Sequence, residues 1–176
     1  MKNQKLKFAV SWILVIIWAS IIFNLSSKSA PESTVQSQGL ITTVVGFFGQ
    51  VIDGEEEMLQ IDGIVRETAH GIEYFIFGAL VFNALYICLN YRKQEEMLLT
   101  AETGIEVIDR FRAINCIICA ILISSIYALS DEIHQISVPG RAFQLMDLFI
   151  DMIGAIIGII CLYMFFKSRE NKRKKW

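Results

Sequence analysis

The chain has 176 residues, of which 54% are hydrophobic and only two are proline. This composition is too apolar for an ordinary soluble domain and indicates an integral membrane protein. The 16 basic and 18 acidic residues give a formal net charge of −2, which hides a strong asymmetry between segments and by itself says little about partners. No nucleic-acid partner is expected.

Four segments are long and apolar enough to cross a membrane, because about 20 mostly apolar residues span about 30 Å of hydrocarbon as a helix. They contain no Lys or Arg, and only Glu73 and Asp151 place a formal charge inside them. The first is longer than the apolar region of a typical signal peptide, so we expect it to remain as an anchor. The predicted spans are residues 8–25, 71–89, 113–130 and 148–166, within one all-α membrane domain covering residues 1–176.

A shorter apolar segment lies between the first two spans. Hydrophobic residues recur at helical spacing from Leu40 to Ile52, but this segment is too short to cross a bilayer. We expect a short amphipathic helix that lies at the membrane interface or over the mouth of the four-helix bundle.

The distribution of positive charge predicts the topology. The segments before the first span, between the second and third, and after the fourth hold 13 of the 16 Lys and Arg residues. The positive-inside bias therefore places these segments and both termini in the cytoplasm. The tail at residues 167–176 is strongly basic, and we expect it to attract the anionic lipid of the inner leaflet.

Ionisable residues cluster where the predicted helices meet the outer face. Arg66, His70 and Glu73 are spaced i, i+4, i+7 and share one face of a helix. Pro139-Gly140-Arg141 predicts a turn that presents a guanidinium. The ligand-binding candidates are Arg66, His70, Glu73, Asp131, Glu132, His134, Gln135, Arg141, Asp147 and Asp151.

Two interpretations of this cluster stay open. A charge near the bilayer centre costs about 2.5 to 3.5 kcal/mol, so Glu73 and Asp151 are expected to face the bundle or a wet cavity. The first interpretation is structural: carboxylates in first helical turns and ion pairs between helices would only stabilise the bundle. The second is functional: both histidines of the chain, His70 and His134, belong to the cluster, which favours proton transfer, metal binding or anion recognition.

The sequence carries no specific metal or catalytic motif. A zinc-protease motif, a P-loop, a dinucleotide fingerprint and a nucleophilic serine motif are all absent from it. The Cys116-x-x-Cys119 pair lacks the other ligands of a zinc site. No cofactor is expected, and a divalent metal is the alternative because imidazole and carboxylate groups suit zinc. The metal-ligand candidates are His70, Glu73, Asp131 and His134, with Asp151 as a further carboxylate.

Several motifs follow one another at a specific spacing. They are Asn24 to Ser29, Arg66-x-x-x-His70-x-x-Glu73-Tyr74, Asp131-Glu132-Ile133-His134-Gln135, Pro139-Gly140-Arg141, and Asp147, Asp151 and Gly154. In these motifs the chain resembles the VanZ-like family of bacterial membrane proteins, related to a teicoplanin-resistance accessory protein. The resemblance implies a role in the cell envelope near peptidoglycan precursors or glycopeptide drugs, in the bacterial cytoplasmic membrane.

The leading hypothesis is an accessory protein whose outer-face polar pocket binds an anionic envelope component. Arg66 and Arg141 would hold its phosphate or carboxylate, because a guanidinium forms a planar fork suited to both. The alternative is an outer-face hydrolase or transferase acting on a lipid-linked or peptidoglycan group, with or without a metal. Its catalytic candidates are Glu132, His134 and Asp151.

Small residues in the last span predict close helix packing. Gly154 and Gly158 form a small-x-x-x-small stripe, which suits contact within the bundle or across a homodimer. Transport is a weaker interpretation, because the charged residues lie at one end of the spans and not at the midplane.

Overall fold

The structure, a computed structural model, describes residues 2–47, 55–97 and 105–173. These residues form five helices and no strand: α1 (Lys2–Ser26), α2 (Ala30–Phe47), α3 (Glu55–Met97), α4 (Ile105–Gln135) and α5 (Leu145–Arg173). Four of the helices contain a segment long and apolar enough to cross a membrane, at Gln4–Ser26, Gln60–Leu89, Arg112–Gln135 and Leu145–Lys172. The predicted all-α membrane bundle with a short additional helix is confirmed.

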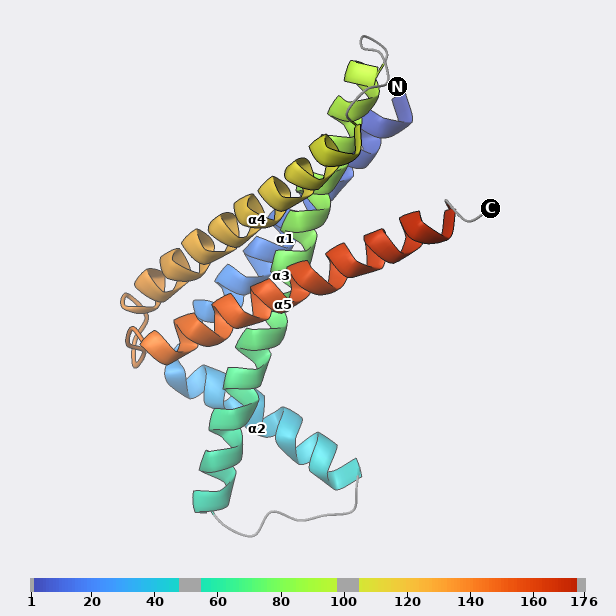
Figure 1. Ribbon diagram of the computed structural model, residues 1–176. Helices are drawn as coiled ribbons and strands as arrows, with labels where there is room; N and C mark the ends of the chain where they lie inside the picture. Colours follow the sequence, from blue (N-terminus) through green and yellow to red (C-terminus); the bar gives the residue numbers. More distant parts are fainter. Residues whose placement is uncertain (1, 48–54, 98–104, 174–176) are drawn as a thin grey trace.

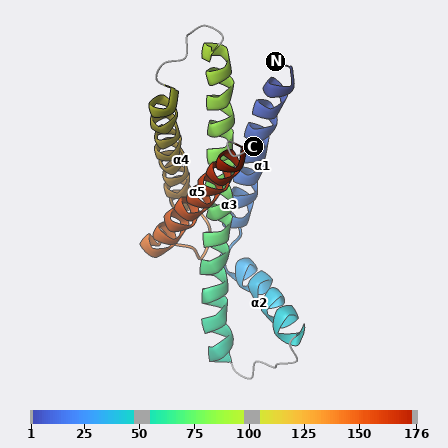
Figure 2. The same cartoon turned by 45° about the vertical axis from the view of Figure 1, so that its right-hand side comes forward.

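Helix α3 is the centre of the arrangement. It contacts each of the other four helices. Helices α1, α4 and α5 surround its middle and second half, while α2 lies beside its first half (Figures 1 and 2). Its 43 residues correspond to about 65 Å of helix, roughly twice the hydrocarbon thickness. The first turns of α3, with α2 beside them, extend beyond one end of the four-helix bundle (Figures 1 and 2).

Helix α2 begins at Ala30, ten residues earlier than the amphipathic helix predicted from Leu40 to Ile52. A local capping contact explains the early start, because the backbone N–H and hydroxyl of Ser29 both donate to Glu32 Oε2, at 3.0 and 2.9 Å. These hydrogen bonds lower the pKa of the Glu32 carboxyl. The predicted residues 48–52 lie outside the described part of the chain.

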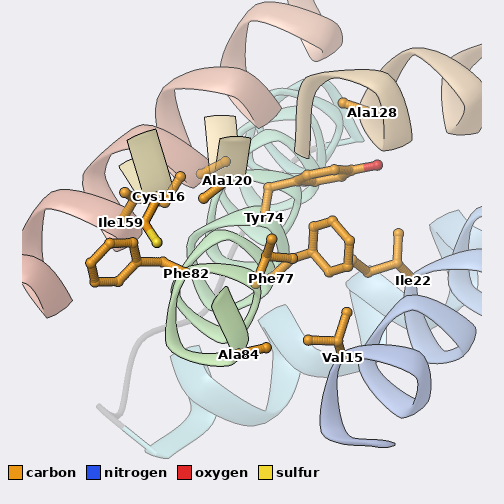
Figure 3. Packing of buried hydrophobic residues seen from close by; sticks show 12 residues of the cluster. Val15, Ile22, Tyr74, Phe77, Phe82, Ala84, Cys116, Ala120, Ala128 and Ile159 are labelled. Atoms are coloured by element: carbon orange, nitrogen blue, oxygen red, sulfur yellow. The ribbon is translucent and has the colours of Figure 1, made fainter. Parts of the chain in front are cut away.

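The bundle interior is filled by residues of all four spanning helices (Figure 3). Tyr74 and Phe77 of α3 form an aromatic group with Tyr127 of α4, with ring centroids 4.7 to 6.3 Å apart. Many large apolar side chains face outward instead, such as Ile16 with 63% and Ile126 with 67% of their surface exposed. A surface of this kind is expected where helices face lipid.

Two hydrogen bonds attach α1 to its neighbours within the apolar region. The indole N–H of Trp18 donates to the backbone carbonyl of Glu73 at 2.9 Å. The Tyr127 hydroxyl donates to the carbonyl of Ala19 at 2.6 Å. Both fix the end of α1 against α3 and α4 close to the polar residues described below.

Helices α3 and α5 approach each other closely through glycines. A Cβ atom added at Gly78 would lie 2.5 Å from the carbonyl oxygen of Ala155, and one added at Gly154 or Gly158 would collide with the backbone carbonyl of Gly71 or Phe75. The small-residue stripe of α5 is therefore used within the bundle, against α3, in the way expected of small residues in membrane helices.

Substitution at this crossing should destabilise the bundle. Gly158→Ala places a methyl group against the Phe75 carbonyl, and overpacking of this kind costs about 1 to 3 kcal/mol. Gly63→Ala on α3 is the matched control, because its Cβ meets no atom within 4 Å, and removing a helical glycine stabilises by about 0.5 to 1 kcal/mol. Thermal unfolding in detergent should show opposite shifts; equal midpoints for the two variants would contradict the close approach.

Candidate functional site

The predicted polar residues lie at one end of the four-helix bundle, which we call the polar end. It is formed by the last turn of α1, the start of α2, the middle of α3, the end of α4, and the α4–α5 connection with the first turns of α5. Figure 1 shows this end at the lower left of the bundle, opposite the end of α3 and the beginning of α4.

A pocket of about 230 Å³ opens at the polar end, between α1, α2, α3 and the α4–α5 connection. We call it the cationic pocket, because Lys28, Arg66 and Arg141 line it with His70, while Glu73 is the one carboxylate in its lining. The remaining lining residues are Leu25, Ser26, Ser33, Ser37, Val65 and Ala69.

Arg141 is placed by a tight turn between α4 and α5. The turn predicted at this sequence is present: the Arg141 N–H donates to the Val138 carbonyl at 3.1 Å, and Gly140 has a φ of 77°. Pro followed by Gly at these two central positions is the pattern of a type II turn, whose second central residue needs positive φ. The turn returns the chain over the end of α1 and presents the guanidinium to the pocket.

A chain of hydrogen bonds holds Arg141 in position. Its Nε donates to the carbonyl of Lys28 at 3.1 Å, and its Nη1 donates to Gln135 Oε1 at 3.4 Å. Gln135 Nε2 in turn donates to Asp131 Oδ2 at 3.4 Å, and the hydroxyl of Ser26 donates to the same oxygen at 2.7 Å. The connection between α1 and α2 and the end of α4 thus orient this guanidinium.

Arg66 brings a second guanidinium to the pocket from α3. Its Nε is buried and has no hydrogen-bond partner among the described residues. The pKa of Arg141 is lowered mainly by partial burial and also by the nearby positive charge of Arg66. Its guanidinium nevertheless stays charged at neutral pH. Two like charges at one pocket repel each other, and an anion placed between them would relieve that repulsion.

His70 links the pocket to a buried carboxylate. Its Nδ1 lies 3.6 Å from Asp151 Oδ1, with 11% of the His70 side chain and none of the Asp151 side chain exposed. This separation is longer than a hydrogen bond, and it suits an ion pair when the imidazole is protonated. Neither oxygen of Asp151 has a hydrogen-bond partner among the described residues, so His70 is the group that compensates this carboxylate.

Glu132 has a structural function at the start of α5. Its Oε2 accepts the backbone N–H of Gln144 at 2.9 Å, directly before the first residue of α5. A carboxylate in this place satisfies a free N–H and interacts favourably with the positive end of the helix dipole. Asp147, in the first turn of the same helix, is also buried.

His134 lies outside the cationic pocket. Its ring stacks on Phe23 of α1 with a centroid distance of 4.4 Å, and its Nε2 lies 3.0 Å from the Ser27 hydroxyl. The aromatic contact and the hydrogen bond bind the end of α4 to the end of α1. His134 therefore joins α4 to the end of α1.

The structure thus divides the ten predicted ligand-binding residues into two groups. Arg66, His70, Glu73 and Arg141 line the pocket. The other six, which do not line it, are Asp131, Glu132, His134, Gln135, Asp147 and Asp151. Five of these six are buried, with His134 the partly exposed exception. Asp131 and Gln135 form the hydrogen-bond chain to Arg141, and Asp151 lies beside His70.

The predicted metal and catalytic residues are distributed over α3, α4 and α5. Across the described ranges, no group of three or more His, Cys, Asp or Glu side chains has a geometry that could hold a metal ion. The catalytic candidates Glu132, His134 and Asp151 do not line the pocket. Among the pocket residues, His70 places its imidazole next to a buried carboxylate, that of Asp151.

Sequence reasoning did not assign Lys28, Ser26, Ser33 and Ser37 to the site, although all four line the pocket. The signal for the first two was present, because Ser26 and Lys28 belong to the motif from Asn24 to Ser29 that ends the first span. Ser33 and Ser37 come from α2, whose early start was not predicted. Ser37 also donates its hydroxyl to Asp62 of α3, which joins the two helices.

Comparison with known proteins gives one match. The family model for VanZ/LLP1 matches residues 11–167, which is most of the chain and includes every residue of the cationic pocket. No curated protein and no solved structure matches the chain.

The contact between His70 and Asp151 should be measurable as an energetic coupling. In a double-mutant cycle of His70→Ala and Asp151→Ala, the free energies of unfolding should be non-additive by about 1 to 3 kcal/mol, because residues in direct contact couple by this amount. Ser37→Ala with Asp151→Ala is the control cycle: Ser37 contacts Asp62, eight residues and about 12 Å along α3 from His70. Additivity within about 0.5 kcal/mol in both cycles would show that the pair is not formed.

Proposed function

The chain belongs to the VanZ-like family described by the VanZ/LLP1 model, and from this premise we propose an accessory membrane protein of the bacterial cell envelope whose cationic pocket binds an anionic envelope component. The observation that carries the proposal is the pocket itself. It is lined by Lys28, Arg66 and Arg141, and the buried Nε of Arg66 has no partner among the described residues.

The chemistry of the pocket favours a phosphate or a carboxylate as the bound group. Guanidinium groups bind both through two parallel N–H donors, which gives directional recognition as well as charge attraction. Arg141 is already held by Lys28 and Gln135, so little freedom remains to be lost when an anion binds. Among the serine hydroxyls of the lining, Ser33 supplies a further donor, because those of Ser26 and Ser37 already donate to Asp131 and Asp62.

We place the polar end at the outer face of the cytoplasmic membrane, with both termini in the cytoplasm. The support is the distribution of Lys and Arg, of which 13 of 16 lie in segments at the opposite end of the spans. In this orientation the pocket meets peptidoglycan precursors and glycopeptide drugs on the side where both occur. The family resemblance therefore connects the pocket with tolerance of teicoplanin-type antibiotics.

Loss of one pocket cation should abolish this phenotype. In a glycopeptide-susceptible bacterium that expresses the chain, Arg66→Gln should return the minimal inhibitory concentration of teicoplanin to that of the empty vector. Arg169→Gln is the matched control, because this arginine lies near the end of α5, 4.8 Å from the ring of Phe165 and outside the pocket. Equal membrane abundance of both variants is required, and unchanged tolerance with Arg66→Gln would overturn the proposed function.

The proposed orientation has its own test. A green fluorescent protein fused after Trp176 should fluoresce, and alkaline phosphatase fused there should be inactive, because the first is active only in the cytoplasm and the second only outside it. The same two reporters inserted after Gly140, within the α4–α5 turn, should give the reverse pattern. Active alkaline phosphatase at the C-terminus would place the pocket on the cytoplasmic side.

A further inference from the structure

A second hollow adjoins the cationic pocket on the outer surface of α1. It has a volume of about 490 Å³ and is lined by Ile16, Ile17, Ser20, Ile21, Asn24, Leu25 and Lys28. Leu25 and Lys28 also line the cationic pocket. The two hollows therefore meet at the end of α1, and we call the second one the α1 groove.

The α1 groove is an apolar surface that faces the lipid. Ile16, Ile17 and Ile21 are 63%, 50% and 39% exposed. Each of its two uncharged polar side chains makes a hydrogen bond within the helix: Ser20 Oγ donates to the Ile16 carbonyl at 2.9 Å and Asn24 Nδ2 donates to the Ser20 carbonyl at 2.7 Å. A hydrocarbon chain that lies over them leaves these two hydrogen bonds intact.

The dimensions of the groove match those of one leaflet. From Leu25 to Ile16 the helix rises about 14 Å, and half of the bilayer hydrocarbon is about 15 Å thick. The groove lies within the spanning segment Gln4–Ser26, with its cationic end where that segment terminates. A charged head above and an apolar chain below is the order of groups in a membrane lipid.

We propose that the anionic component bound by this protein is a membrane lipid, with its phosphate head group in the cationic pocket and a hydrocarbon chain along the α1 groove. This inference rests on the proposed function, since it names the chemical class of the ligand for the same pocket. Lys28, which lines both hollows, marks the level at which head group and chain join. Entry is lateral, from the outer leaflet, and needs no opening of the bundle.

The first test compares ligands on the wild-type protein in a non-ionic detergent. Dioctanoyl phosphatidylglycerol should bind at least about tenfold more tightly than glycerol 3-phosphate, which has the phosphate but no chain, and than dioctanoyl phosphatidylcholine, which has the chains but no net charge. Arg66→Gln should weaken phosphatidylglycerol binding about tenfold, the effect of losing one charged hydrogen bond. Native mass spectrometry and titration calorimetry measure both.

The second test blocks the groove. Ile17→Trp should weaken phosphatidylglycerol binding several-fold and leave the affinity for glycerol 3-phosphate unchanged. Ile118→Trp is the matched control: Ile118 lies on α4, is 49% exposed against 50% for Ile17, and lines neither hollow. Both variants keep an apolar lipid-facing surface, so insertion and folding should be equal.

The outcomes separate the two proposals. If glycerol 3-phosphate binds as tightly as phosphatidylglycerol and Arg66→Gln removes both, the ligand is a soluble anion and the lipid inference is overturned while the pocket stands. Equal effects of Ile17→Trp and Ile118→Trp on lipid affinity would also overturn it. If neither ligand responds to Arg66→Gln, the proposed function fails together with the inference.

Discussion

The close approach of α3 and α5 is the constraint on which the polar end depends. Gly154 lies against the backbone of Gly71, and each of these glycines is within three residues of a residue of the contact between His70 and Asp151, which joins the two helices. A side chain at Gly154 would collide with the backbone of Gly71, move the helices apart and separate the imidazole from the carboxylate. An apolar packing feature therefore determines a polar contact.

This arrangement matters because polar groups at the level of the membrane have few partners to choose from. Asp131, Glu132 and Asp151 are all buried, and each has at least one oxygen without a hydrogen-bond partner among the described residues. Buried ionisable groups in a spanning segment are costly and usually mark a functional site. Here the carboxylates lie behind the cationic pocket, where they attract its cations without occupying it.

The sequence predicted the elements better than the site. Four spans could be found because each is a long apolar run, and the α4–α5 turn could be found because Pro139-Gly140 has specific dihedral preferences. The start of α2 was missed, because the capping contact between Ser29 and Glu32 outweighs the polar character of the following residues. Hydrophobic spacing identifies a buried face and says little about where a polar helix begins.

The residues that line the pocket could be predicted only in part, and the reason is geometric. Helical spacing places Arg66, His70 and Glu73 on one face of α3, and all three line the pocket. The same argument applied to Asp131, His134 and Gln135 gives a shared face of α4, but the neighbouring helix decides what each side chain meets. His134 contacts Phe23 and Ser27 of α1, whereas Asp131 is covered by Ser26 and Gln135. Spacing along one helix carries no information about the helix opposite.

The position of α1 connects the proposed pocket to the bilayer. Trp18 and Tyr127 fix one side of this helix to the bundle by hydrogen bonds to backbone carbonyls, so its opposite side remains available to lipid. Lys28 follows directly where the helix ends, and its carbonyl holds Arg141. The same short segment thus anchors a guanidinium of the pocket and terminates an apolar surface of about one leaflet in length. A ligand that is both anionic and embedded in the membrane would meet both features at once, whereas a soluble anion would use only the first.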